Sequence, residues 1–240
     1  QKIFEIISGT LMGSDSLKVE GLKLLLKLHK IRHALEVYFD VFNLHQTLHD
    51  LLSNDNTTVV CYSLSVISNC ISQHMNTNID IETYLALLRE DRDVVVATLK
   101  CLSVHIKASH SCTHAEEFKA LIGVIFDLLR EGDYQVSYHS IQILAEYSEK
   151  APINDVASIN WNAITNSLLE MIKSEKAHDD ICLLNKVFSV YKTTGQLIRL
   201  EELKQYLEEG GIINSLCEYR ESCDPIEAEN VDILLYEFPH

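Results

Sequence analysis

Apolar residues recur along this chain in a three-point pattern. Each copy is an apolar residue followed by others five and eight positions later, usually just after a short polar or acidic turn. Successive copies begin 35 to 46 residues apart. Such a period is typical of stacked helical repeats, because a single unit cannot bury its apolar faces alone. The six copies are Leu17/Leu22/Leu25, Val59/Leu64/Ile67, Val94/Leu99/Leu102, Val136/Ile141/Leu144, Cys182/Val187/Val190 and Ile226/Val231/Leu234.

Polar turns separate paired helical segments. In residues 82–102, apolar residues at helical spacing run from Tyr84 to Leu88, a charged break follows, and a second apolar stripe begins at Val94. The breaks carry Asn, Asp, Ser and Gly, which favour helix caps and tight turns. No segment alternates apolar and polar residues with period two. The pattern therefore predicts an all-α chain.

The composition permits a packed core and one continuous array. The chain has 240 residues, is 47% hydrophobic, and contains 3 Pro and 8 Gly. Connections between the units are short, so we expect residues 1–240 to form a single repeat domain. The chain lacks an initiator Met and opens in a helical pattern, so we expect a fragment of a longer protein. No apolar run approaches the ~20 residues needed to span a bilayer, so we expect no membrane partner.

Net charge bears on the class of binding partner, and cysteine content bears on the cellular compartment. The 20 basic and 35 acidic residues give a net charge of −15, which argues against a nucleic-acid partner because phosphates would be repelled. The 7 cysteines are an odd number and include no CxxC pair. Most lie at apolar helical positions, as expected for reduced thiols. We therefore expect a cytoplasmic or nuclear protein, or one found in both compartments.

The last unit carries the most specific motif. Residues 206–236 contain Glu-Glu-Gly-Gly-Ile-Ile, a charged turn and a final apolar helix that ends near Tyr236. This unit resembles an armadillo repeat, and in particular the terminal repeat of importin-α proteins. The earlier units resemble the armadillo and HEAT group in pattern only. The resemblance implies a right-handed superhelical solenoid of about six armadillo/HEAT-like repeats.

The resemblance also implies a peptide-binding groove lined by the third helix of each repeat. In importin-α this groove presents a Trp and, four residues later, an Asn. Those positions lie one and five residues after the middle residue of each copy described above. Only Asn69 matches, no Trp does, and Phe188 and several lysines occupy other positions in the register. The candidate groove residues are Lys23, Lys27, Asn69, Lys100, Gln142 and Lys192.

These residues favour a protein-interaction module, a scaffold or adaptor that binds a peptide segment or helix of another protein. Without a tryptophan ladder, a receptor for nuclear localisation signals is not expected. A line of lysines would attract acidic or phosphorylated segments, as in the β-catenin branch of the family. The alternative is that these lysines are ordinary solvated residues. Two other functions stay open, namely a structural or dimerisation domain of a larger regulatory protein and a transport adaptor for basic cargo. The oligomeric state is also open.

Histidines offer two weak metal-binding patterns. His45 and His49 are four apart on an expected helix, without the Glu of an HExxH motif. Residues 105–114 hold three His and Cys112 at an expected helix end and loop, with spacings of two that suit a metal poorly. There is no GxSxG motif, no glycine-rich phosphate loop and no nucleophile with a base in a familiar context. We expect no metal, no cofactor and no enzyme activity.

Overall fold

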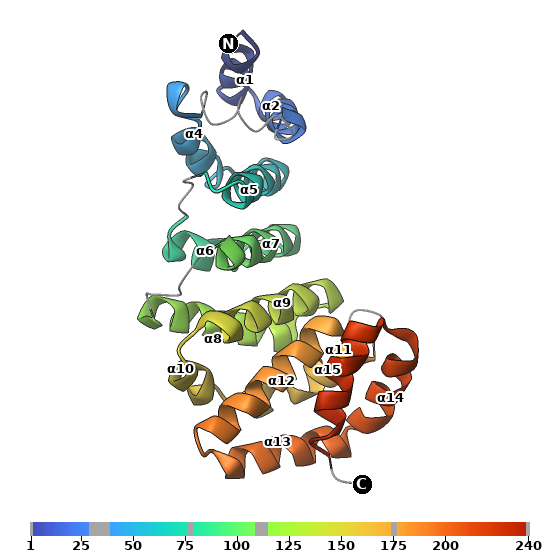
Figure 1. Cartoon of the computed structure of the whole chain (residues 1–240). Helices are drawn as coiled ribbons and strands as arrows, with labels where there is room; N and C mark the ends of the chain where they lie inside the picture. Colours follow the sequence, from blue (N-terminus) through green and yellow to red (C-terminus); the bar gives the residue numbers. More distant parts are fainter. Residues whose placement is uncertain (1, 29–38, 76–78, 109–114, 174–176, 239–240) are drawn as a thin grey trace. The chain divides into compact units, whose positions relative to one another are not determined.

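The computed structural model describes residues 2–28, 39–75, 79–108, 115–173 and 177–238, with no account of the side chains of 115–117. Every regular element in these residues is an α-helix or a short 3-10 helix, so the prediction of an all-α chain is confirmed (Figure 1). The chain divides into two compact units, Gln1–Ser109 and His110–His240. A single continuous domain, the number of repeats and the hand of a superhelix stay predictions.

The first unit pairs short helices with longer ones. Its helices are α1 (Lys2–Leu11), α2 (Asp15–Leu28), α4 (Leu44–Leu51), α5 (Thr57–Ser72), α6 (Ile81–Leu87) and α7 (Arg92–Ala108). The long helices α2, α5 and α7 pack in succession, and α1, α4 and α6 each pack on the long helix that follows. The expected helix–turn–helix order is confirmed for each of these pairs.

The second unit continues with the same kinds of element. Its helices are α8 (Ala115–Glu131), α9 (Tyr134–Lys150), α10 (Ile153–Ser158), η1 (Trp161–Ile164), α11 (Thr165–Ile172), α12 (His178–Thr193), α13 (Leu197–Glu209), α14 (Ile212–Ser222) and α15 (Pro225–Leu235). Helices α9, α12 and α15 pack in succession, and α14 packs on α15.

The apolar pattern forms the core of both units. Each of the six copies lies within one helix, namely α2, α5, α7, α9, α12 and α15. The middle and last residues of every copy are buried, as the pattern predicts. The first residue is less regular, because Leu17 is 48% exposed, Ile226 is 75% exposed and Cys182 is half-buried. The first position therefore contributes to the core only in α5, α7 and α9.

Acidic and amide side chains begin several helices. Asn56, Asp80, Asp133 and Asp224 each precede a helix and accept hydrogen bonds from backbone N–H groups of its first turn. These bonds satisfy donors that the first turn leaves unpaired. The capping role expected of the polar breaks is thus confirmed at four helix starts.

The Gly-Gly turn of the last unit separates α13 from α14. Gly211 adopts φ 80°, a left-handed conformation that costs glycine little. A Cβ on Gly210 would lie 2.1 Å from Leu169 Cδ1, so the Leu169 side chain would have to shift to make room for it. The backbone path therefore favours glycine at position 211, whereas glycine at position 210 leaves room for Leu169.

Candidate functional site

The candidate residues of the first unit lie on consecutive helices. Ser65 and Asn69 of α5 and Lys100 of α7 line one hollow of about 320 Å³. Lys23 of α2 reaches toward α5, with its Nζ 5.7 Å from the centroid of the Tyr62 ring. This distance is within the range of a cation–π contact. Two of the candidate residues, Asn69 and Lys100, thus share one hollow, and Lys23 lies against the same helix α5 through Tyr62.

The hollow between α5 and α7 has a mixed lining, and we call it the α5–α7 hollow. Apolar side chains form its floor, and hydroxyl, amide and charged groups reach its rim. Its lining residues are Cys61, Leu64, Ser65, Ser68, Asn69, Asp93, Val96, Ala97, Lys100 and Cys101. An apolar floor with a few polar groups is typical of a surface that binds a ligand.

The lysines of this surface differ in how they are paired. Lys23 donates a 2.8 Å hydrogen bond to Glu20, and this bond raises the pKa of Lys23. Lys27 is exposed in the last turn of α2. Lys100 is exposed and makes no ion pair with any part of the chain that the structure describes. Lys100 is therefore available to an acidic ligand, and Lys27 likewise has no ion pair among the described residues.

An acidic group also lines the hollow. Asp93 lies one turn before Ala97, and its Oδ1 is 3.3 Å from Nη1 of Arg92. Burial and the charge of Asp93 raise the pKa of the Cys61 thiol, which stays protonated at neutral pH. The α5–α7 hollow therefore offers one free cation and one paired carboxylate.

The candidates of the second unit already have partners within that unit. Gln142 donates through Nε2 to the Tyr138 hydroxyl at 3.0 Å, and its Oε1 lies 2.9 Å from His139 Nδ1. Lys192 forms an ion pair with Glu237, which also lies 3.4 Å from Lys204 Nζ. Burial would raise the pKa of Glu237, but its two lysine partners outweigh this and lower it. The charge of Lys192 is thus already compensated.

One of the two register positions in α12 is buried. Phe188 falls at the position that Lys23 and Lys100 occupy in their helices, yet it is 2% exposed. Its ring lies 6.0 Å from that of Phe238, which follows α15. Sequence reasoning also missed Tyr62 and Asp93, although an aromatic residue two positions before the middle apolar residue was a visible signal for Tyr62.

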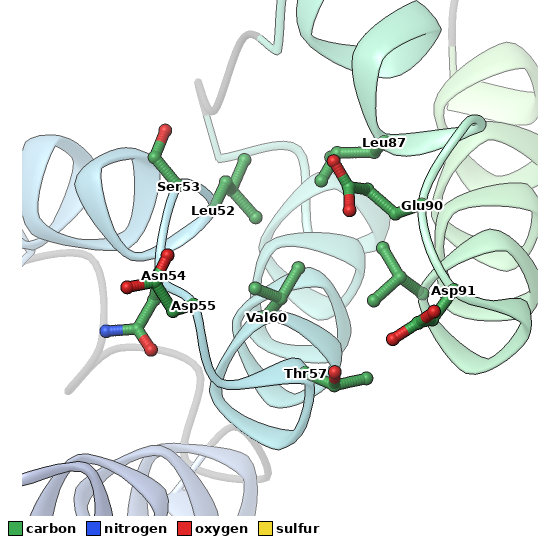
Figure 2. Close-up of a pocket in the computed structure, with 10 residues that line it drawn as sticks. Leu52, Ser53, Asn54, Asp55, Thr57, Val60, Leu87, Glu90 and Asp91 are labelled. Carbon is green, nitrogen blue, oxygen red and sulfur yellow. The ribbon is translucent and has the colours of Figure 1, made fainter.

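A second hollow of the first unit lies beside the turns that precede α5 and α7. Figure 2 shows that Leu52, Val60 and Leu87 form its apolar part and that Asp55, Glu90 and Asp91 stand around it. Its volume is about 260 Å³, and its other lining residues are Ser53, Asn54, Thr57 and Val94. The three carboxylates give this hollow a negative potential that favours basic ligands.

The histidine patterns do not assemble into a metal centre within the described residues. There, no group of three or more His, Cys, Asp or Glu side chains is arranged to hold an ion. His45 packs edge-on against Phe39 with ring centroids 4.9 Å apart, and burial lowers its pKa. His105 Nδ1 lies 3.1 Å from the Tyr84 hydroxyl. The remaining ligands of that pattern, residues 110–114, lie outside the described residues.

Solved structures match the fold of this chain. No protein-family model matches the chain, and no curated protein matches it. Among the described helices, none is both long and apolar enough to cross a bilayer. Similar solved structures include designed and engineered proteins with 13–16% identity to this chain.

Three of these structures are similar over nearly the whole chain. A designed armadillo repeat protein in complex with the peptide (KR)4 has a TM-score of 0.69 and 14% identity, with 100% of both chains covered. A second designed armadillo repeat protein has a TM-score of 0.68 and 13% identity, with 97% of this chain and 98% of its own covered. An engineered protein has a TM-score of 0.71 and 14% identity, with 99% and 98% covered. The chain therefore has an armadillo-like repeat fold.

Proposed function

We propose that this chain is a non-enzymatic adaptor that binds a peptide segment of another protein across α2, α5 and α7. One observation carries the proposal. Two candidate groove residues from separate repeats, Asn69 and Lys100, line one hollow together with Ser65. The fold supports it, because armadillo-like neighbours include a designed protein in complex with a peptide.

The ligand we propose is acidic or phosphorylated at the point that faces Lys100. Lys100 has no ion-pair partner among the described residues, and Lys23 and Lys27 extend the positive edge along α2. The Asn69 amide is placed to bond a peptide backbone, and the apolar floor of the hollow would bury one ligand side chain. Apolar contact would supply most of the affinity, while charge would set the register.

A random peptide library displayed on phage tests this proposal without assuming a partner. Peptides selected on the wild-type chain are measured by fluorescence polarisation against Lys100→Glu and Asn69→Ala. Lys173→Glu is the matched control, because Lys173 is an exposed lysine of the second unit. We expect selected peptides rich in Asp and Glu that bind the first two variants at least about tenfold more weakly. Peptides that bind all four proteins equally would refute the proposed surface.

A second candidate function is supported by the acidic hollow of Figure 2. Asp55, Glu90 and Asp91 surround it, and the chain carries a net charge of −15. These features favour basic cargo of the kind that a transport adaptor would carry. The peptide (KR)4 serves as the probe. Binding that weakens with salt and is lost in Asp55→Asn/Glu90→Gln/Asp91→Asn would support this function over the first.

The compartment we propose is reducing, in the cytoplasm or the nucleus. The cysteines that the structure describes are free thiols. Burial raises the pKa of Cys70 to about 12 and that of Cys101 to about 11, so both behave as small apolar core residues.

A further inference from the structure

Helix α15 is apolar on two sides but is covered on only one. Val231 and Leu234 are fully buried. On the other side, Ile226 is 75% exposed, Ile233 is 51% exposed and Tyr236, the residue that caps the helix, is 91% exposed. Exposed apolar residues that gather on one side of an element often mark an interaction surface. The exposed side of α15 therefore has the composition of an interface.

The exposed residues form one continuous stripe. Ile226, Glu229, Ile233 and Tyr236 are spaced by three, four and three positions, so they share one face of the helix. We call these four residues the open face of α15. From Ile226 to Tyr236 the stripe is about 15 Å long, which is nearly three helical turns. A second helix lying alongside would match this length and shape.

The covered sides of α15 are held firmly. Asn185 of α12 donates an amide hydrogen bond of 2.9 Å to the backbone carbonyl of Asn230. From α14, Arg220 donates to Asp232 through Nη2 at 2.9 Å, and the Tyr219 hydroxyl donates to Glu227 at 2.9 Å. The open face is thus presented on a fixed helix, which lowers the entropy cost of binding a partner.

Charge defines the chemistry of the partner. Glu229 lies within the open face, is exposed and has no ion-pair partner in the described part of the chain. Residues 211–238 contain seven Asp and Glu against one Arg. Asp232 is paired with Arg220 and Glu237 with Lys192 and Lys204, so Glu229 is the carboxylate of the open face that stays available to a partner. A partner therefore needs apolar side chains for the two isoleucines and Tyr236, flanked by Lys or Arg.

We propose that the open face of α15 docks an amphipathic helix of a partner protein whose apolar stripe is flanked by basic residues. This site does not rest on the peptide-binding function proposed for α2, α5 and α7. Each site can therefore be tested without the other.

The probe is a synthetic amphipathic peptide of leucine and lysine, about 14 residues long, which spans ~21 Å as a helix. Its matched control has the same leucines with glutamate in place of lysine. Fluorescence polarisation is measured on the wild-type chain and on Ile226→Ser/Ile233→Ser. The control variant is Ile198→Ser, because Ile198 is 79% exposed on α13 and lies outside the open face.

We expect the lysine peptide to bind the wild type and Ile198→Ser alike, and the double variant at least about tenfold more weakly. Glu229→Gln should weaken binding and reduce its dependence on salt. The glutamate peptide should not bind. These variants replace exposed side chains, and circular dichroism verifies that each remains folded.

Several results would overturn the proposal. Equal binding to all variants would mean that the lysine peptide is attracted by net charge alone. No binding to the wild type would mean that the face does not accept a basic helix. If sedimentation velocity shows a wild-type dimer that Ile226→Ser/Ile233→Ser abolishes, a second copy of this chain occupies the face instead.

Discussion

Replacing Asp180 by Asn should stabilise the protein at neutral pH. Asp180 lies in the first turn of α12 and is 1% exposed. Neither carboxyl oxygen has a hydrogen-bond partner within the described residues. Burial raises the pKa of Asp180 well above its ordinary value, and the neighbouring charge of Asp179 adds to this. Burial therefore favours the neutral form of this carboxyl in the folded state to higher pH than in the unfolded state.

The expected magnitude follows from the linkage between protonation and folding. Because the folded pKa is raised, the contribution of Asp180 to stability is fully present below the unfolded pKa of 3.8 and is lost as pH rises through the folded pKa. Between the two pKa values, this one group lowers the free energy of unfolding by about 1.4 kcal/mol per pH unit. Asn has nearly the same shape and no charge, so Asp180→Asn should remove this decrease of the free energy of unfolding with rising pH.

Guanidinium denaturation followed by circular dichroism tests this prediction between pH 4.5 and pH 8. The variant should exceed the wild type in stability by a margin that grows with pH until the folded pKa is passed. Asp91→Asn is the control, because Asp91 is exposed and its removal changes net charge equally. A constant difference across pH, or the same growing difference in the control, would refute a buried neutral carboxyl at Asp180.

Three further predictions concern single residues. Gly211→Ala should lower the free energy of unfolding by about 1–2 kcal/mol, and the positive φ alone should cause this because no atom lies within 4 Å of the new Cβ. Gly9→Ala within α1 is the control and should not destabilise the protein. Denaturation midpoints compare the two variants. Phe188→Ala should lower the free energy of unfolding by about 3–5 kcal/mol in the same assay, because it leaves a cavity where the buried ring packs. A loss below about 1 kcal/mol would contradict the burial of Phe188. Burial lowers the pKa of His105. The contribution of the neutral His105 ring to the free energy of unfolding is therefore fully present above pH 6.5 and is lost as pH falls through the folded pKa. An NMR titration midpoint at or above 6.5 would contradict that burial.

The helices could be predicted because their signals are local. The three-point pattern depends only on helical periodicity. The caps at Asp80 and Asp133 depend only on the first turn of the helix that follows each of them. The glycine turn at Gly211 is local in the same sense. These features need no knowledge of distant contacts, and the structure confirms them.

The site could be predicted only in part, because its surroundings depend on distant residues. Phe188 is buried since Phe238, fifty positions later, packs against it. The charge of Lys192 is compensated by Glu237, which also lies far away in the sequence. No periodicity along α12 encodes either contact. By contrast, Asn69 and Lys100 belong to helices that pack directly on each other, and both line one hollow, while their role in binding stays a prediction.

Photo-crosslinking tests the central claim, that a peptide binds across α2, α5 and α7, most directly. Ser65→p-benzoylphenylalanine places a photoreactive group in the α5–α7 hollow, and Glu208→p-benzoylphenylalanine places one on the exposed side of α13. Each variant is irradiated with a labelled peptide selected on the wild-type chain. The account predicts crosslinks from position 65 that excess unlabelled peptide abolishes, and none from position 208. Crosslinks from position 208 alone would contradict it.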